Sequence, residues 1–199
     1  MNSKTLEFWF SYGSTYTYLT VARLGELATS KGVVVDWKPF ILRVITRELG
    51  MPKGPFGSNP AKLGYMWRDV ERRAARHGLQ YKKPSIYPVD SQSTAHVGLL
   101  AAREGWCAEF TRLVFHWNFV EGRPIGVEGN LEGILRELGK NPEEVIAKAQ
   151  SDEIKDAMIR QTDEAKSLGI FGSPSFIIAG ELFWGDDRLE DALAWCLSH

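Results

Sequence analysis

The chain has 199 residues, of which 44% are hydrophobic, 12% aromatic and 25% charged, and its formal net charge is −1. This even balance of charge excludes a general nucleic-acid binder, which needs a clustered basic surplus. The aromatic content excludes a disordered chain. The sequence also lacks an uninterrupted apolar run of the roughly 18 residues that a membrane span needs. We therefore expect a folded protein with a full hydrophobic core.

The first ten residues contain neither the apolar segment nor the small-residue cleavage site of a secretory signal. This predicts a cytoplasmic protein. The two cysteines, Cys107 and Cys196, lie far apart and form no C-x-x-C motif, so we expect reduced thiols that take no part in catalysis. The four histidines show no metal-binding spacing, and no metal site is expected.

The first forty residues predict a strand, a helix and a second strand. Residues 5–10 are short and rich in aromatic side chains, which is typical of a buried strand. A polar turn with Gly13 follows, and apolar residues then recur at helical spacing as far as Gly32. Residues 33–39 form the next strand, which ends at a proline. This order favours a parallel pair of strands with a right-handed crossover.

The middle of the chain is predicted to be helical. Residues 41–62 are rich in glycine and proline and predict a long loop, and residues 81–91 predict a second loop. The clearest helix start is Asn141-Pro142, with Asn as the N-cap and Pro at the first helical position. The expected helices span residues 61–78, 92–121, 128–139, 142–149 and 151–168.

The last thirty residues return to strands. Residues 175–179 and 182–184 predict two strands joined by a tight turn at Gly180-Glu181. A final helix is expected from Arg188 to Leu197.

The overall order is βαβ, then a helical block, then ββα. This is the order of an α/β protein with a thioredoxin-like fold and a large all-helical insertion. We expect residues 1–60 and 169–199 to form the thioredoxin-like domain, and residues 61–168 to form the insertion domain.

Ser14, in the turn before the first helix, and Pro174, just before the third strand, suggest a site. In thioredoxin-like folds a cis-proline faces that turn, and X-Pro bonds are the ones for which cis is cheap. Redox members of this fold carry C-x-x-C where residues 14–17 read Ser-Thr-Tyr-Thr, so thiol–disulfide exchange is excluded at this turn. A hydroxyl at a helix N-terminus instead suits an anion such as a ligand thiolate. Simple N-capping by Ser14 is the alternative.

A second polar cluster opens the last helix. It reads Trp184-Gly185-Asp186-Asp187-Arg188-Leu189. The two carboxylates predict a cradle for the ammonium–carboxylate end of a ligand, with Asp187 as the partner of the ammonium group. Interaction of both carboxylates with the helix dipole alone is the alternative.

These motifs resemble those of the 2-hydroxychromene-2-carboxylate isomerases and, more broadly, of the kappa-class glutathione transferases in the DsbA-like thioredoxin superfamily. The family opens with an aromatic strand and Ser-Pro-aromatic-Ser-aromatic-Leu, which residues 14–19 match in part. Its Lys-x-x-Tyr-hydrophobic stretch is matched by residues 62–66. Its late signatures, Phe-Gly-x-Pro-x-Phe and Trp-Gly-x-Asp-Arg-Leu, are matched by residues 171–176 and 184–189.

The resemblance implies a glutathione site. Ser14 would hydrogen-bond the glutathione sulfur and stabilise its thiolate. Ser173, just before Pro174, would pair its backbone with the cysteinyl part of glutathione. Residues 185–187 would bind the γ-glutamyl end, and Lys62 would meet the glycine carboxylate.

The resemblance also implies a substrate pocket. Tyr87 matches a tyrosine of the family's pocket. We expect Tyr65 and Trp67 to form part of the pocket wall, and packing of both side chains in the core of the insertion is the alternative.

This chain departs from the family pattern in the loop of residues 50–60 and at three single positions. Thr15 replaces the proline after the serine, and Ser11 replaces an aspartate. Thr46 stands where the naphthalene-pathway isomerases carry a lysine for the substrate carboxylate. Arg43 or Arg47 is a candidate replacement for that lysine.

The function expected from the resemblance is a glutathione-dependent isomerase acting on an aromatic or conjugated small molecule. The thiolate would add reversibly to a conjugated carbon, the ring would open, a bond would rotate, and elimination would return the thiolate. A kappa-like glutathione transferase or peroxidase is the first alternative, and a non-catalytic thioredoxin-like binding module is the second. The family also implies a homodimer, and neither a nucleic-acid nor a membrane partner is expected.

Overall fold

The computed structural model describes residues 4–199, which contain a four-stranded sheet of strand order β2-β1-β3-β4. β1 (Lys4–Phe10) and β2 (Val33–Pro39) are parallel, as the sequence predicted. β3 (Ser175–Ile178) runs antiparallel to β1, and β4 (Glu181–Trp184) runs antiparallel to β3. The predicted thioredoxin-like fold is thereby confirmed.

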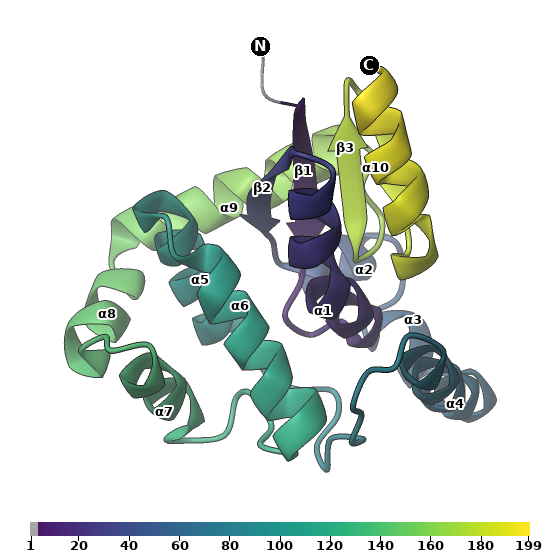
Figure 1. The fold of residues 1–199 in the computed structure, drawn as a ribbon. Helices are drawn as coiled ribbons and strands as arrows, with labels where there is room; N and C mark the ends of the chain where they lie inside the picture. The colour runs from purple at the N-terminus through teal and green to yellow at the C-terminus, as the bar shows by residue number, and fades with distance from the viewer. Residues whose placement is uncertain (1–3) are drawn as a thin grey trace.

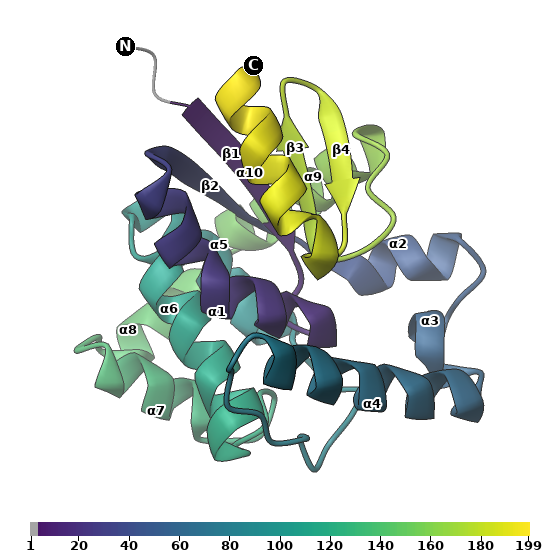
Figure 2. The same cartoon turned by 45° about the vertical axis from the view of Figure 1, so that its right-hand side comes forward.

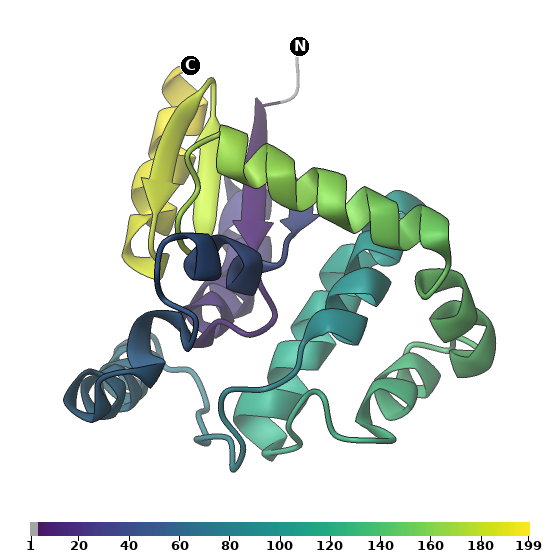
Figure 3. The ribbon, with the colours of Figure 1, turned by 180° about the vertical axis from the view of Figure 1, so that it is seen from behind.

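Helices cover both faces of this sheet (Figure 1). α1 (Thr15–Ser30) and α10 (Leu189–Ser198) lie on one face. α9 (Asp152–Ser167) crosses the other face, with α2 (Leu42–Glu48) beside it, as the view from behind shows (Figure 3).

The side chains of β1 alternate between these two layers. Leu6, Phe8 and Phe10 are fully buried in the main hydrophobic core. Trp9 is fully buried in a second cluster with Phe40 and Ile45. Burial of apolar surface on both faces of a short central strand is the main favourable contribution to its stability.

The helical part packs beside and below the sheet. Its further elements are α4 (Pro60–Arg76), α5 (Gln92–Glu104), α6 (Cys107–His116), a π-helical turn η1 (Trp117–Glu121), α7 (Asn130–Glu137) and α8 (Pro142–Ala149). Four of the five predicted helices are confirmed with small differences at their ends. The main core takes buried side chains from both predicted parts, including Leu24 from α1 and Phe110 from α6. No helix within residues 4–199 is both long and apolar enough to cross a membrane.

The prediction of a single helix over residues 92–121 was wrong. Gly105 ends α5 in a left-handed conformation with φ 82°, which glycine adopts without a Cβ clash. The chain then restarts as α6 and closes with η1 rather than with a regular α-helical turn. Gly105 was the one local sequence signal for this break.

The prediction of an unbroken loop over residues 41–62 was also wrong. This segment contains α2 and the short α3 (Gly54–Gly57). α2 is held by tertiary contacts, since Ile45 is buried in the second cluster against the sheet. Helices this short are not stable from local propensity, so the sequence pattern carried little sign of them.

The hairpin between β3 and β4 turns one residue earlier than predicted. Its corner is Ala179-Gly180, both with positive φ (50° and 83°), rather than Gly180-Glu181. Positive φ at both positions is what a type I′ hairpin turn requires. A 3₁₀ turn, η2 (Asp186–Arg188), then leads into α10, close to the predicted helix start.

Candidate functional site

Ser14 lies at the N-terminus of α1 and contacts the loop before β3. Its backbone is extended (φ −91°, ψ 127°), and its Oγ accepts a hydrogen bond from the Thr17 N–H at 3.4 Å. The same hydroxyl donates to the Ser173 carbonyl at 2.8 Å. Ser14 is thus an N-cap, as the simple capping interpretation predicted. It also faces Ser173, as the interpretation of a ligand site required. Its side chain is only partly buried.

The Ser173-Pro174 peptide bond is cis, as expected from the fold. Ser173 is 8% exposed, and its Oγ accepts from the Ser11 N–H at 2.9 Å. The Pro174 carbonyl accepts from the Gly185 N–H at 3.0 Å. The Ser173-Pro174 loop therefore joins the turn before α1 to the turn before α10, and so brings together two of the predicted motifs.

Gly185 fixes the start of the second turn. Its φ is 113°, and a Cβ added there would lie 2.4 Å from Asp187 Oδ1. An alanine at this position would therefore be strained and would displace the Asp187 carboxylate. The Asp187 side chain is 47% exposed and receives a hydrogen bond from Arg188 at 3.0 Å. Its carboxylate is accessible to a ligand.

Asp186 differs sharply from its neighbour, since it is only 2% exposed. Its Oδ2 accepts a hydrogen bond from Arg73 Nε on α4 at 3.0 Å, and Arg73 Nη2 forms a salt bridge with the same oxygen at 2.8 Å. Arg23 of α1 lies 3.9 Å from the same oxygen and donates to the Asp186 carbonyl at 2.9 Å. Burial raises the pKa of Asp186 to about 6, although the two guanidinium groups favour the carboxylate. In this structure the carboxylate binds arginines of the protein itself.

α4 runs beneath the N-terminus of α1 (Figure 2). The Thr15 hydroxyl donates to the Met66 sulfur at 3.3 Å. The Tyr16 hydroxyl donates to Asp69 at 3.0 Å, and burial together with the Asp69 charge raises the pKa of that phenol. These contacts place the wall of the helical part directly beside Ser14.

The predicted substrate residues on and near α4 separate into different environments. Tyr87 is half-buried, and its hydroxyl lies 4.0 Å from the Met66 sulfur, which also contacts Thr15. Trp67 is 8% exposed, belongs to the main core and meets Tyr87 edge-on at 4.9 Å between ring centroids. Tyr65 is 61% exposed, with the Arg72 guanidinium 5.5 Å from its ring. Tyr87 thus shares the Met66 sulfur with Thr15, the residue after Ser14, whereas Trp67 packs mostly as a core residue.

Two predicted cationic residues are exposed. Lys62 places its Nζ 5.4 Å from the Phe56 ring, whose centroid lies 6.5 Å from that of Tyr16. Arg43 on α2 is exposed too, whereas Thr46 is 2% exposed and its hydroxyl donates to the Arg43 carbonyl at 3.3 Å. Thr46 therefore takes no substrate carboxylate in this conformation, while Arg43 remains accessible.

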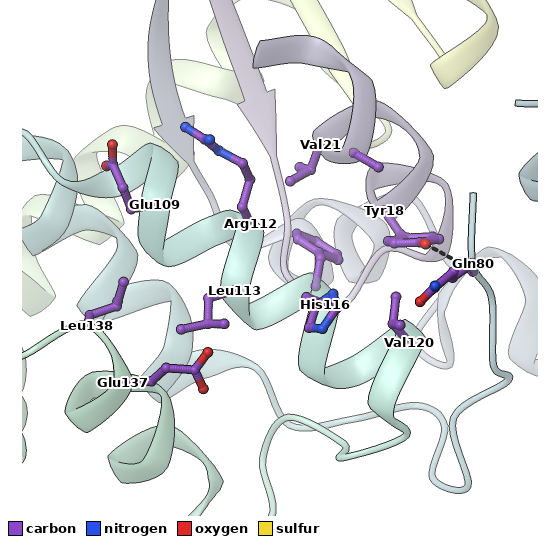
Figure 4. Close-up of a pocket in the computed structure, with 12 residues that line it drawn as sticks. Tyr18, Val21, Gln80, Glu109, Arg112, Leu113, His116, Val120, Glu137 and Leu138 are labelled. Carbon is purple, nitrogen blue, oxygen red and sulfur yellow. Dashed lines mark hydrogen bonds between the residues drawn. The ribbon is translucent and has the colours of Figure 1, made fainter. Parts of the chain in front are cut away.

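A concavity of about 640 Å³ lies elsewhere, between α1, α6 and α7 (Figure 4). The Tyr18 hydroxyl at its edge donates to the Gln80 carbonyl. The polar side chains of its otherwise apolar lining are Gln80, Glu109, Arg112, His116 and Glu137. Its lining includes neither Ser14 nor the predicted ligand-binding residues, so it does not define the site.

The two cysteines are buried and free, at 3% exposure for Cys107 and 2% for Cys196. Burial raises the pKa of Cys107 to about 12 and also raises that of Cys196. Neither thiol is suited to act as a nucleophile near neutral pH.

Sequence reasoning missed four residues that shape the site, namely Thr17, Met66, Arg73 and Arg23. One signal was available for two of them, because Met66 and Arg73 fall on one helical face with Asp69 and Val70. The pattern could indicate the face of α4 that packs inwards. It could not indicate that Asp186 would be the partner of Arg73, since the pair is separated by most of the helical part.

Comparison with known proteins gives the same fold. The family model described as the DSBA-like thioredoxin domain matches residues 5–194. The chain is 23% identical to 2-hydroxychromene-2-carboxylate isomerase of Sphingobium xenophagum over 94% of this chain and 95% of that protein. It is 26% identical to glutathione S-transferase kappa 2 of Caenorhabditis elegans, over 94% of this chain and 89% of the relative.

Comparison with solved structures finds proteins of the same fold. A 2-hydroxychromene-2-carboxylate isomerase structure superposes with a TM-score of 0.85 at 25% identity, over 96% of this chain and 95% of the other. A cytosolic disulfide reductase, DsbM of Pseudomonas aeruginosa with GSH, superposes with a TM-score of 0.68 at 20% identity, over 98% of both chains. The chain therefore belongs to the DsbA-like thioredoxin family, among the relatives of the 2-hydroxychromene-2-carboxylate isomerases and the kappa-class glutathione transferases.

Proposed function

We propose that this protein is a glutathione-dependent isomerase that acts on a small aromatic or conjugated substrate. The observation that carries the proposal is the Ser14 hydroxyl, which caps α1 and faces Ser173-Pro174 at a turn without cysteine. The names of the isomerase and kappa transferase relatives support it. The DsbM structure with GSH adds support for a glutathione site in this fold.

The residues at the turn fit the thiol end of glutathione. The first N–H groups of α1 have no acceptor within the helix, and the positive end of the helix dipole favours an anion there. Ser14 adds an O–H donor that is partly accessible. Bound glutathione would supply a thiolate nucleophile at this position.

Ser14 makes a hydrogen bond that has to change when it acts. Its O–H now donates to the Ser173 carbonyl, so it must turn away from that carbonyl to donate to a ligand sulfur. The Ser173 carbonyl is then open to a peptide N–H of the ligand. Once turned, this donor stabilises the anion and lowers the pKa of the thiol.

The remaining groups suit the two ends of the tripeptide. Asp187 offers an accessible carboxylate for the γ-glutamyl ammonium group, and Gly185 and the Asp186 backbone bring the chain close beside it. Lys62, exposed at the first turn of α4, is the proposed partner of the glycine carboxylate. We place Tyr87 and Tyr65 at the substrate, with Trp67 supporting Tyr87 from the core. Arg43 or Arg47, both exposed, is the proposed partner of a substrate carboxylate.

A kappa-like glutathione transferase is the second candidate. The 26% identity to a kappa transferase supports it, and it would use the same turn with a different substrate. Both candidates are proposed as cytoplasmic homodimers, and the likeness to a cytosolic disulfide reductase supports the proposed location.

Calorimetric titration with glutathione tests the shared part of the proposal, because a non-catalytic binding module that has lost the site would release no heat of binding. Absorbance assays with hydroxychromene carboxylate and with chlorodinitrobenzene then separate isomerase from transferase. Turnover of the first substrate alone supports the isomerase. Turnover of the second alone replaces it with the transferase, and the absence of glutathione binding overturns both.

A further inference from the structure

Ser173 is tied to the turn before α1 by two hydrogen bonds and to the first turn of α1 by a third. Its Oγ accepts from the Ser11 N–H at 2.9 Å, and its carbonyl accepts from the Ser14 hydroxyl at 2.8 Å. The third bond joins the hydroxyls of Ser173 and Thr17, 2.8 Å apart. These three partners, Ser11, Ser14 and Thr17, follow one another at intervals of three residues. The turn before α1 and the first turn of α1 therefore hold the same side of the Ser173-Pro174 loop.

Thr17 differs from the other hydroxyl residues in having no access to solvent. It is 0% exposed, whereas Ser14 is partly exposed. A ligand bound at the turn therefore cannot touch Thr17. A buried hydroxyl is costly without a partner, and Ser173 Oγ is the partner that satisfies it. The branched side chain also has few χ1 rotamers, which restricts where its oxygen can lie.

We propose that Thr17 is a positioning residue for the thiolate site. Through the Ser173 hydroxyl it sets where the Ser173 carbonyl lies relative to Ser14. That distance determines how the Ser14 hydroxyl is shared between the carbonyl and a ligand sulfur. The inference rests on the proposed glutathione function and adds a residue to it that acts without contacting the ligand.

The expected effect falls on the chemistry more than on binding. Displacement of a catalytic group by about 1 Å can lower a rate roughly a hundredfold. The two ends of glutathione are held elsewhere, by the proposed contacts with Asp187 and Lys62, so affinity should change less than the rate. The pKa of the bound thiol should rise, because its stabilising donor is no longer held in place.

The test compares three variants of the full chain. Thr17→Val keeps the shape of the side chain and removes the hydroxyl, and Thr17→Ser restores a hydroxyl. The matched control is Thr20→Val on the same helix. Thr20 is also 0% exposed, but its hydroxyl finds no hydrogen-bond partner among the described residues. For each protein we would measure glutathione affinity by calorimetry, the pKa of the bound thiol from thiolate absorbance, and kcat and KM in the two assays above.

We expect Thr17→Val to raise the pKa of the bound thiol and to lower kcat by roughly tenfold to a hundredfold. Its KM for glutathione should change by less than kcat. Thr17→Ser should recover most of the wild-type pKa, and Thr20→Val should match wild type. A wild-type thiol pKa in Thr17→Val overturns the inference, as does an equal effect of Thr17→Val and Thr20→Val.

Two further results keep the inference separate from folding and from the proposed function. If Thr17→Val does not fold, Ser173→Ala removes the same hydroxyl pair from its other end, together with the acceptor of the Ser11 N–H. This variant must raise the thiol pKa, or the inference fails. If calorimetry shows that the wild-type protein binds no glutathione, that result alone overturns the proposed function, before any variant is compared.

Discussion

Arg73 of α4 donates a hydrogen bond from Nε to Asp186 Oδ2 at 3.0 Å, and its Nη2 lies 2.8 Å from the same oxygen in a salt bridge. The pair joins the helical part of the chain to the turn that carries Asp187. Arg23 of α1 lies against the same carboxylate from the thioredoxin-like part. A buried carboxylate that contacts two elements in this way fixes the turn before α10 relative to both α1 and α4.

This carboxylate should make stability depend on pH. Its folded-state pKa of about 6 lies above the ordinary value of 3.8, mainly because of burial. The folded state therefore binds the proton more tightly than the unfolded chain, and the contribution of the group to stability is lost as pH rises from about 4 to about 6. Arg73, Arg23 and Asp187 are the charged groups that act on it.

Asp186→Asn should remove this dependence. As pH falls from 7 to about 4, we expect the melting temperature of wild type to rise relative to that of the variant. The corresponding gain in the free energy of unfolding is on the order of 2 kcal/mol. Thermal melts of both proteins across that range are the measurement. A difference in melting temperature between the two proteins that stays constant across this pH range would show that Asp186 does not titrate in it.

Asp187 should matter for ligand affinity more than for stability. A charge-assisted hydrogen bond contributes about 1.5–3 kcal/mol, whereas a carboxylate near a helix N-terminus contributes only about 0.3–1 kcal/mol through the dipole. Asp187→Asn should thus weaken glutathione binding roughly tenfold or more, with a small change in melting temperature. Asp191→Asn is the matched control, because Asp191 is exposed and pairs with the same Arg188 at 2.8 Å. Equal affinities of the two variants would remove Asp187 from the site.

Ser14 should be the residue on which turnover depends. Removing a preorganised donor to a developing anion typically costs about 10²–10³ in rate. Ser14→Ala should therefore lose turnover sharply while glutathione still binds, and the pKa of the bound thiol should rise. Calorimetry and thiolate absorbance measure the two effects separately. Ser11→Ala is the comparison at the same turn, since Ser11 contacts Ser173 through its backbone N–H. Full activity of Ser14→Ala would shift attention to Ser11.

The cysteines should be dispensable for activity. Both thiols are buried, and burial raises the pKa of Cys107 to about 12. We expect the double variant Cys107→Ala, Cys196→Ala to retain glutathione-dependent turnover per folded molecule and to lose about 1 kcal/mol of stability or somewhat more, because two packed side chains become smaller. Turnover corrected for the folded fraction from circular dichroism is the measurement. A loss beyond that correction would contradict the assignment of the thiol chemistry to a bound ligand.

The sequence by itself determined the elements that depend on local pattern. The aromatic run of β1, the Ser14 cap, the Asn141-Pro142 helix start and the order of strands and helices were predictable, because caps and periodicity act within a few residues. The absence of a C-x-x-C motif likewise excluded thiol–disulfide exchange at the turn before α1, because that chemistry needs a thiol there.

Only the tertiary structure decided the contacts between distant segments. α2 exists because Ile45 is buried against the sheet, and no local pattern predicts a helix so short. Asp186 is bound by Arg73 while the adjacent Asp187 is exposed, a difference that two neighbouring carboxylates in a sequence do not reveal. The hydrogen bond between Thr17 and Ser173 likewise joins residues that are far apart in the sequence, and no local pattern indicates it. Burial and partner choice arise from packing between elements, so they are properties of the folded chain and not of any one segment.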